Sequence, residues 1–431
     1  MTPAARLAAA MEVLEGIETL RQPASQVLKD WGSKHRFAGS KDRAAIASIV
    51  YDVLRVRSSA SWIMGAETPR ALVLGAMKRA RGMDVSSISD LCSGIAHAPD
   101  PLNDDERQRL ETATLADAPA HIAADIPLWL SEPLQHALGS RFLEEAEAMT
   151  QRAPVDVRVN NLKGNRDSTL AAMEHLAPQA TRLSPWGMRM AVGEDGRGPA
   201  LAAEPAFVKG LVELQDEGSQ LAALVSGVQP GWQVLDLCAG AGGKTLALAA
   251  MMTNRGQIFA TDSDGRRLMP IYKRLEKSGV RNVQVRAPKG TKDVLADLEE
   301  RCNLVFVDAP CTGSGTWRRN PDAKWRMRPG ALDQRIREQN DVLEAAARFV
   351  KPAGRLVYVT CSLLCEENED RIAAFLEKDA RFAPVEVKAL AEACGVVELG
   401  QYASMHGPGL RLSPAVSGTD GFYIAVLSRL V

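Results

Sequence analysis

Two cysteines lie where apolar segments end, and thiols in such places are inert, bind a metal or act as nucleophiles. Cys311 lies in FVDAPCTGSGTW (306–317) and Cys361 in YVTCSLLCEENED (358–370). A single buried cysteine is most often inert. Structural zinc sites use four ligands at short paired spacings, and Cys361 and Cys365 have no second pair of cysteines or histidines to accompany them. The sequence therefore predicts no metal site, and leaves inert thiols and a nucleophile as alternatives.

The nucleophile interpretation corresponds to a specific reaction. Carbon 5 of cytosine is too weakly nucleophilic to accept a methyl group directly, but a thiolate that adds to carbon 6 makes carbon 5 enamine-like. Such covalent catalysis divides one difficult step into easier ones. Asp308 is placed to hydrogen-bond the ring, and the base would have to leave its stack. One thiol suffices for the attack and a second could assist release, so the chemistry alone leaves the roles of Cys311 and Cys361 open.

The segment LDLCAGAGGKT (235–245) resembles two phosphate-binding loops and completes neither. A GxxxxGK[ST] loop would need glycine at Cys238, and a GxGxxG loop would need it at Thr245. The glycines still allow a ligand to approach the backbone closely at a helix N-terminus. Asp262 lies 19 residues after Gly243, where a carboxylate can accept both hydroxyls of a ribose. A nucleoside cofactor without a pyrophosphate, such as S-adenosylmethionine, fits this pattern.

Alternating apolar segments and helical stretches must position these residues. Five β-rich segments are predicted strands: 233–237, 257–261, 283–287, 303–308 and 355–360. Predicted helices separate them, one of them over 291–302, and 420–430 is predicted as a final strand. This alternation predicts a parallel sheet with helices on both faces. Because ligands bind beyond the carboxyl ends of such strands, the glycine loop, Asp262, Asp308–Cys311 and Thr360–Cys361 are expected to face one crevice.

The rest of the chain is organised differently. Residues 1–140 are predicted to be mostly helical, with Ile46, Ile49, Val50, Val53 and Leu54 on one stripe of a helix over 42–57. Residues 153–164 alternate as a strand. The chain has 431 residues, a net charge of -1 and 7 cysteines, which favours two or three domains in a reducing compartment. No apolar run reaches the roughly 18–20 residues of a membrane span, and we expect a cytoplasmic protein.

The segment 317–337 is locally basic despite the neutral chain. It holds seven arginines and lysines against two aspartates, and Trp317 and Trp325 are interleaved with them. Cations for phosphates and aromatic rings for stacking are typical of contact with single-stranded nucleic acid. The alternative is a charged helix and loop with two core tryptophans. The pattern favours RNA or DNA contact.

At these motifs the sequence resembles the RsmB/NOP/Sun family of RNA cytosine-5 methyltransferases. LDLCAGAGGKT is similar to the cofactor loop of that family, and DAPCTGSGTWRRNPDAKW and TCSLLCEEN are similar to its two cysteine motifs. The N-terminal helical region, with KDRAAIASIVYDVLR, is similar to the NusB-like domain of the bacterial family members that act on ribosomal RNA. The resemblance implies an α/β fold with three parts: a helical NusB-like RNA-binding domain (1–140), a small α/β subdomain (145–215) and a Rossmann-like, doubly wound methyltransferase sheet (216–431).

The resemblance also implies roles for residues. Cys361 would attack carbon 6, Cys311 would assist release of the product, and Asp308 would orient the base. The partner would be RNA, with ribosomal RNA favoured by the NusB-like front, and the cofactor S-adenosylmethionine. The expected cofactor contacts are Cys238, Ala239, Gly240, Ala241, Gly242, Gly243, Lys244, Asp262 and Asp308.

The sequence departs from the family pattern in two places. Gly240 and Ala241 replace the usual Ala or Ser and Pro of the cofactor loop, and no acidic residue follows the third predicted strand before Asp293. These departures support one alternative, an RNA-binding ribosome-assembly factor whose methyltransferase fold is catalytically impaired. A methyltransferase for exocyclic nitrogens is set aside, because DAPC has a thiol where such sites have an aromatic residue.

Overall fold

The computed structural model describes residues 1–193, 196, 198–290 and 292–431, and the chain forms two compact units in it. The helical unit comprises Met1–Ala153, Val192–Arg197 and Thr316–Arg328. The sheet unit comprises Pro154–Ala191, Gly198–Gly315 and Pro329–Val431. Among the described residues, no helix combines the length and the apolar character needed to span a bilayer.

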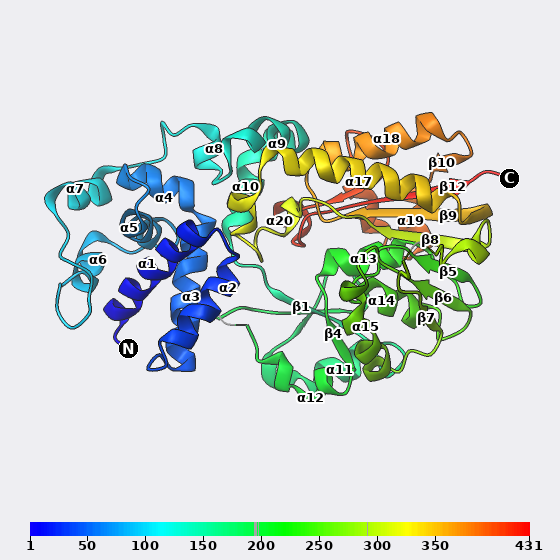
Figure 1. Cartoon of the computed structure of the whole chain (residues 1–431), viewed down its shortest axis with the longest axis horizontal. Helices are drawn as coiled ribbons and strands as arrows, with labels where there is room; N and C mark the ends of the chain where they lie inside the picture. The colour runs from blue at the N-terminus through cyan, green and yellow to red at the C-terminus, as the bar shows by residue number, and fades with distance from the viewer. Residues whose placement is uncertain (194–195, 197, 291) are drawn as a thin grey trace. The chain divides into compact units, whose positions relative to one another are not determined.

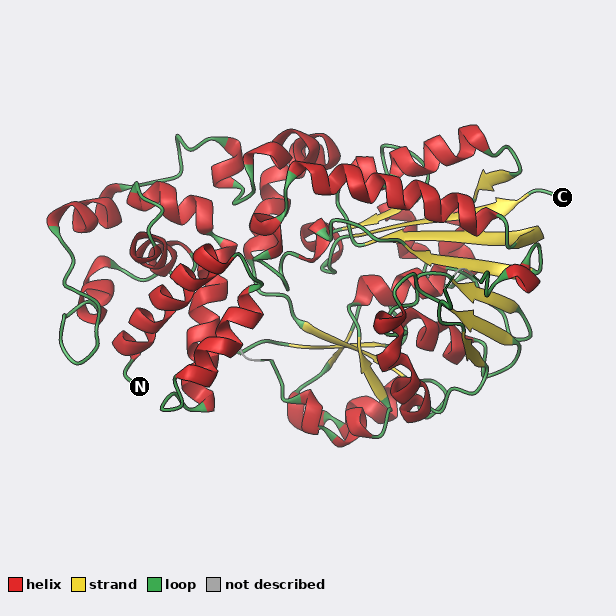
Figure 2. Ribbon diagram, viewed as in Figure 1, coloured by secondary structure: helices red, strands yellow, loops and turns green. Residues whose placement is uncertain are grey.

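The helical unit consists of helices, and those from α1 to α7 contribute to one apolar core (Figures 1 and 2). Helix α3 buries Ile46, Ile49, Val50, Val53 and Leu54, as the sequence stripe predicted. The helices are α1 (Pro3–Leu20), α2 (Ala24–Lys34), α3 (Ser40–Arg55), α4 (Arg57–Met64), α5 (Pro69–Arg79), α6 (Val85–Leu91), α7 (Asp104–Thr112), α8 (Ala120–Ala123), α9 (Ser131–Leu138), α10 (Phe142–Thr150) and α16 (Ala323–Arg326).

Thr316–Arg328, here called the docked segment, caps the C-terminal end of α3. The last carbonyls of a helix have no partner within it. Trp325 Nε1 donates to Leu54 O (2.6 Å) and Lys324 Nζ donates to Arg55 O (2.8 Å). In return Arg55 donates to the carbonyl of Arg318 (2.9 Å). The docked segment is therefore part of the helical unit, although about 160 residues of the sheet unit precede it in the chain.

The docked segment corrects the prediction that 317–337 faces nucleic acid throughout. Trp317 is only 1% exposed, and Arg318 and Lys324 are also buried. Burial lowers the pKa of Lys324 to about 8, although Asp125 acts in the opposite direction. Of the predicted contact residues in the docked segment, Arg326 remains exposed, and so does Arg328.

The sheet unit contains a small antiparallel sheet with the strand order β2-β3-β1-β4. An ion pair supports it: Arg189 Nε lies 2.7 Å from Oδ1 of the buried Asp156 on the neighbouring strand. The elements are β1 (Val155–Val159), α11 (Arg166–Ala172), β2 (Gln179–Ala180), β3 (Gly187–Met190), α12 (Pro205–Val208) and β4 (Val212–Leu214). The alternation over 153–164 thus forms a strand, as predicted.

The large sheet has the order β10-β12-β9-β8-β5-β6-β7, and β11 pairs with β12. The five predicted strands form its parallel part, from β9 to β7. The final strand, β12, pairs antiparallel with β9. The strands are β5 (Gln233–Asp236), β6 (Gln257–Ala260), β7 (Val283–Val285), β8 (Cys302–Asp308), β9 (Val350–Thr360), β10 (Phe382–Pro384), β11 (Leu410–Leu412) and β12 (Phe422–Arg429).

Helices cover both faces of the large sheet, which makes the sheet doubly wound (Figure 2). On one face α13 (Glu217–Val225), α14 (Gly243–Met251) and α19 (Val387–Ala393) pack into one core cluster. On the other face α17 (Pro329–Ala347) and α18 (Glu369–Lys378) pack into another. The predicted Rossmann-like α/β fold is confirmed.

The predicted helix over 291–302 is wrong. The described part of this stretch contains a single 3-10 turn, Ala296–Leu298. Asp293 turns the chain instead: its carboxylate accepts the backbone N–H of Leu295 (2.9 Å) and pairs with Arg348 (2.8 Å). An aspartate that bonds its own backbone competes with helix formation. The preceding α15 (Gly265–Ser278), which lies between β6 and β7, does form where the sequence predicts a helix.

Candidate active site

Cys311 and Cys361 lie together at the carboxyl ends of β8 and β9. The two strands are parallel neighbours, with Asp308 opposite Val359, so the loops that follow them leave the same edge of the sheet. The two sulfur atoms are 3.4 Å apart, within hydrogen-bonding distance. The hydrogen bond to Cys361 and burial both raise the pKa of Cys311 well above 9.0. Cys311 is therefore a weak acid in this pair, and either sulfur atom can donate the hydrogen bond.

Asp308 and Lys244 form an ion pair beside the thiols. Lys244 Nζ lies 2.6 Å from Asp308 Oδ2 and 5.5 Å from the centre of the Phe422 ring. Burial by itself would lower the pKa of Lys244, but the charges of Asp308 and Cys361 outweigh it and raise that pKa. Lys244, at the end of the glycine loop, thus places a positive charge beside Asp308 and close enough to Cys361 to interact with it electrostatically.

Glu367 anchors the loop that carries Cys311. Its side chain is fully buried, and its Oε1 accepts the backbone N–H of Thr312 (2.8 Å) and the amide of Gln339 (3.0 Å). The hydroxyl of Thr312 donates to its other oxygen. Burial raises the pKa of Glu367, while these hydrogen bonds oppose the rise. The second cysteine motif, which contains Glu367, thus fixes the loop of the first.

The glycine loop adopts a conformation that only glycine allows at one point. Gly242 is the N-cap residue of α14 with φ of +84°, and a Cβ there would lie 2.5 Å from Cγ1 of Ile271. At the other end of the loop, the backbone N–H of Gly240 donates to Asp262 Oδ2 (3.1 Å). The carboxylate of Asp262 also accepts the N–H of Asp264 (3.0 Å). The loop and Asp262 therefore form one hydrogen-bonded structure.

The buried Asp236, at the end of β5, is hydrogen-bonded to the first turn of α14. The hydroxyl of Thr245 donates to Asp236 Oδ2 at 2.6 Å. Burial raises the pKa of Asp236 to about 7 although this hydrogen bond lowers it. The sequence analysis did not single out Asp236 or Glu367. Both lie inside the motifs it quoted, but nothing in those motifs distinguishes a buried anchor from a solvent-exposed acid.

A cavity of about 560 Å³ lies beside the glycine loop and is large enough for S-adenosylmethionine. Cys238, Asp262 and Pro310 are among its lining residues, so the loop, the end of β6 and the Asp-Ala-Pro motif share it. Helix α17 contributes Glu338 and Asp341 to the same lining. The apolar lining suits a base, and the carboxylates of Asp262, Glu338 and Asp341 can accept hydrogen bonds from ribose hydroxyls, so the cavity fits a nucleoside.

The four strand ends that were expected to share a crevice are linked by direct contacts. Gly240 is hydrogen-bonded to Asp262, Lys244 to Asp308, and Cys311 to Cys361. Burial raises the pKa of Cys238, which makes its thiol a poor nucleophile. Asp293, the first acid after β7, does not line this cavity. The arrangement brings a thiol pair, a fixed cation and a nucleoside-sized cavity to one edge of the sheet.

Two family models match this chain. "16S rRNA methyltransferase RsmB/F" matches residues 223–428, and "Methyltr_RsmF/B-like, ferredoxin-like domain" matches residues 126–192. The chain is 30% identical to ribosomal RNA small subunit methyltransferase B of Klebsiella pneumoniae over 444 aligned positions, which cover 97% of each protein.

Solved structures are similar as well. A methyltransferase homologue from Pyrococcus horikoshii is 28% identical with a TM-score of 0.59, over 72% of this chain and 98% of the other. NSun6 from Pyrococcus horikoshii, solved with the S-adenosylmethionine analogue SFG, is 22% identical with a TM-score of 0.60, over 71% of this chain and 98% of the other.

Proposed function

Since this chain belongs to the RsmB/F family of 16S rRNA methyltransferases, we propose that it methylates carbon 5 of a cytosine in ribosomal RNA through a covalent cysteine adduct. The enzyme is an S-adenosylmethionine-dependent methyltransferase. The observation that carries the finer proposal is the distance of 3.4 Å between the sulfur atoms of Cys311 and Cys361. Enzymes that methylate a nucleophilic nitrogen or oxygen directly have no need of a thiol pair.

In the proposed reaction Cys361 is the nucleophile. Its thiolate forms a bond to carbon 6 of the cytosine, and the electron pair of the 5,6 double bond moves into the ring and makes carbon 5 nucleophilic. When bound, S-adenosylmethionine supplies the electrophilic methyl group that carbon 5 takes. Loss of the carbon-5 proton to a base then restores the double bond and expels the sulfur of Cys361. Cys311, whose pKa is raised by burial and by the hydrogen bond to Cys361, would act in this release.

Asp308 and Lys244 support these steps. A carboxyl group beside the ring can hold a proton at the ring nitrogen while the sulfur is attached, and Asp308 is the acid nearest to the thiols along the chain. Lys244, at 2.6 Å, holds the Asp308 side chain in place. The residues that would hold the cofactor are the loop from Cys238 to Lys244 and Asp262, which the cavity and the loop hydrogen bonds bring together.

A denaturing-gel experiment tests the proposal. Cys311→Ala, Cys361→Ala and the wild type are incubated with S-adenosylmethionine and unmodified 16S rRNA. We expect a covalent protein–RNA band with Cys311→Ala, because attack proceeds and release fails, and no band with Cys361→Ala. Sequencing the RNA in the band identifies the base.

Two other results would contradict it. A band with Cys361→Ala alone would exchange the roles of the thiols. The absence of adduct and of methyl transfer, with no calorimetric binding of S-adenosylmethionine, would favour the alternative of an RNA-binding assembly factor. The basis of that alternative is the altered loop at Gly240 and Ala241 and the position of Asp293, which pairs with Arg348 rather than lining the cofactor cavity.

A further inference from the structure

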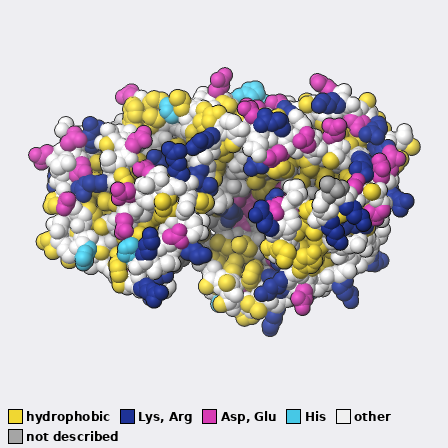
Figure 3. All heavy atoms as spheres, in the orientation of Figure 1, with side chains coloured by type: hydrophobic (Ala, Val, Ile, Leu, Met, Phe, Trp, Pro, Cys, Tyr) yellow, Lys and Arg dark blue, Asp and Glu magenta, His cyan; other side chains and the backbone are white. Residues whose placement is uncertain are grey.

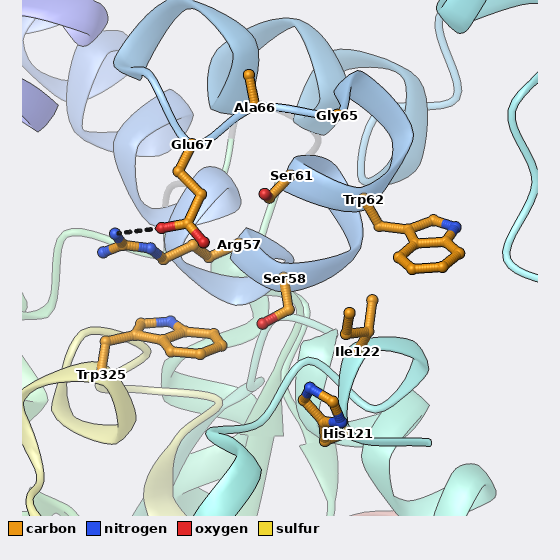
Figure 4. A pocket seen from close by; sticks show the side chains of 10 residues that line it. All are labelled: Arg57, Ser58, Ser61, Trp62, Gly65, Ala66, Glu67, His121, Ile122 and Trp325. Carbon is orange, nitrogen blue, oxygen red and sulfur yellow. Dashed lines mark ion pairs between the residues drawn. The ribbon is translucent and has the colours of Figure 1, made fainter. Parts of the chain in front are cut away.

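A second pocket lies entirely within the helical unit, and no step of the proposed reaction uses it. Its volume is about 780 Å³, and its walls come from α4, α8 and the docked segment (Figure 4). We propose that this pocket binds an unpaired nucleotide of the RNA substrate. The inference rests on the proposed function, since it assumes that RNA is the substrate.

Two tryptophan rings form opposite sides of the pocket. Figure 4 shows Trp62 on one side and Trp325 on the other, with the side chain of Ser58 between them. Trp62 is 39% exposed, a high value for the largest apolar side chain. Its Nε1 donates to the carbonyl of Thr114 (3.1 Å), and Nε1 of Trp325 donates to Leu54 O (2.6 Å). Each ring is thus held by its polar edge, and a base that stacks on it need not order it first.

The remaining lining combines polar side chains with the apolar Ala66 and Ile122. Arg57, Ser58 and Ser61 come from α4, and His121 comes from α8. Arg57 is held at the rim by Glu18 (2.9 Å) and Glu67 (4.0 Å). Hydroxyls and an imidazole offer donors and acceptors to a base edge. Two aromatic rings with such groups between them suit a nucleotide base, which has both an aromatic face and a polar edge.

A neighbouring pocket of about 430 Å³ extends this site. It shares Arg57, Glu67 and Trp325 with the first pocket and adds Arg326 and Arg328 of the docked segment. Arg326 and Arg328 are exposed, although Arg326 also pairs with Asp322. On the face seen in Figure 3, basic and acidic side chains are intermingled. Cations beside stacking rings can contact the phosphates on either side of a bound base.

The chain itself connects this pocket to the thiols. Trp325 lies in the docked segment, which begins five residues after Cys311. The docked segment, which follows the Cys311 loop in the chain, therefore supplies one wall of the proposed nucleotide site. Binding there would help to select the RNA, so its loss should raise KM for RNA and leave kcat and cofactor affinity nearly unchanged.

The test measures RNA binding separately from methyl transfer. The full-length protein is titrated into fluorescein-labelled single-stranded RNAs of about 12 nucleotides, one for each base, and into a fully paired RNA of the same length, at one fixed salt concentration. The variants are Trp62→Ala, Trp62→Phe, which keeps a stacking ring, and Phe37→Ala. Phe37 is the matched control: it is an aromatic residue of the same unit, it is 72% exposed, and it lies outside the pocket.

We expect Trp62→Ala to weaken single-strand binding roughly 5- to 150-fold, the range for the loss of one stacked base. Trp62→Phe should stay within about threefold of the wild type, Phe37→Ala should bind as the wild type does, and the paired RNA should bind least. Equal binding by Trp62→Ala and the wild type for all four RNAs would overturn the proposal and leave the pocket to a protein partner. Failure of the covalent-adduct experiment would not affect this result, because binding needs neither thiol.

Discussion

Removing the buried carboxylate that fixes the Cys311 loop should separate methyl transfer from product release. In Glu367→Ala, the backbone N–H and the hydroxyl of Thr312 lose their acceptors on Glu367, while the amide of Gln339 keeps the carbonyl of Pro310 (2.9 Å). Each buried donor left without a partner costs about 1–3 kcal/mol. The free energy of unfolding should therefore fall by roughly 2–6 kcal/mol. Glu367→Gln keeps one acceptor oxygen and the same shape, so it should lose only about 1 kcal/mol.

The catalytic effect follows from the position of Thr312, which is adjacent to Cys311 in the chain. A displacement of about 1 Å can cost roughly 100-fold in rate, and here it would displace the thiol that acts in release. Glu367→Ala should therefore turn over about 100-fold more slowly and accumulate a covalent protein–RNA adduct, as expected for Cys311→Ala. The affinity for S-adenosylmethionine should stay within about twofold, because the hydrogen bonds of Gly240 and Lys244 go to Asp262 and Asp308 and not to Glu367.

The measurements are urea unfolding, isothermal titration with S-adenosylmethionine, and a denaturing gel beside single-turnover and steady-state methyl transfer. Glu377→Ala on the exposed face of α18 is the control and should behave as the wild type does. Wild-type turnover by a folded Glu367→Ala protein would refute the anchoring role. Equal loss of cofactor binding and methyl transfer would also refute it, since that pattern would mean general damage to the sheet edge.

Three further results follow from the structure. The pKa of Lys324 is about 8 in the folded protein, against an ordinary 10.5, so between these pH values the unfolded chain binds more protons than the folded one. The free energy of unfolding of the wild type should therefore rise by up to about 3 kcal/mol from pH 8 to 10.5. Urea unfolding of Lys324→Met should lack this rise. Mild oxidation with diamide should join Cys311 to Cys361, whose sulfur atoms are 3.4 Å apart, and should abolish methyl transfer until a reductant is added; mass spectrometry that finds other linked pairs instead would contradict this. Gly242→Ala should weaken binding of S-adenosylmethionine at least tenfold by calorimetry, because the φ of +84° and the contact with Ile271 both oppose a Cβ; unchanged affinity would show that the loop does not depend on this conformation.

Local sequence patterns predicted the elements that carry the site. The β-branched segments before Asp262, Asp308 and Cys361 form strands because such short apolar runs fit a buried strand better than a helix. A parallel sheet then brings their ends to one edge, so the contact between Cys311 and Cys361 could be expected before any geometry was known. The helix expected over 291–302 fails because the carboxylate of Asp293 bonds a backbone N–H within its own turn, which hydrophobic period does not show.

Long-range pairing set the limit of prediction. The sequence shows the charge of Lys324 and the aromatic ring of Trp325, and both properties are typical of RNA contacts. It does not show which groups of the protein these side chains pair with. Their partners, the carbonyls of Arg55 and Leu54, lie 269 and 271 residues away. A backbone carbonyl has no sequence signature, so no pattern could reveal that these side chains cap a helix. The same holds for Glu367, whose partner is the N–H of Thr312.

The docked segment also constrains how this chain is made on the ribosome. The helical unit takes its first 153 residues from the start of the chain, but its last piece begins at Thr316. At bacterial and eukaryotic synthesis rates of about 5–20 residues per second, roughly 8 to 30 seconds separate these pieces. During that interval the end of α3 has no Lys324 or Trp325 to cap it. The helical unit is therefore completed only after half of the strands of the large sheet, β5 to β8, have been synthesised.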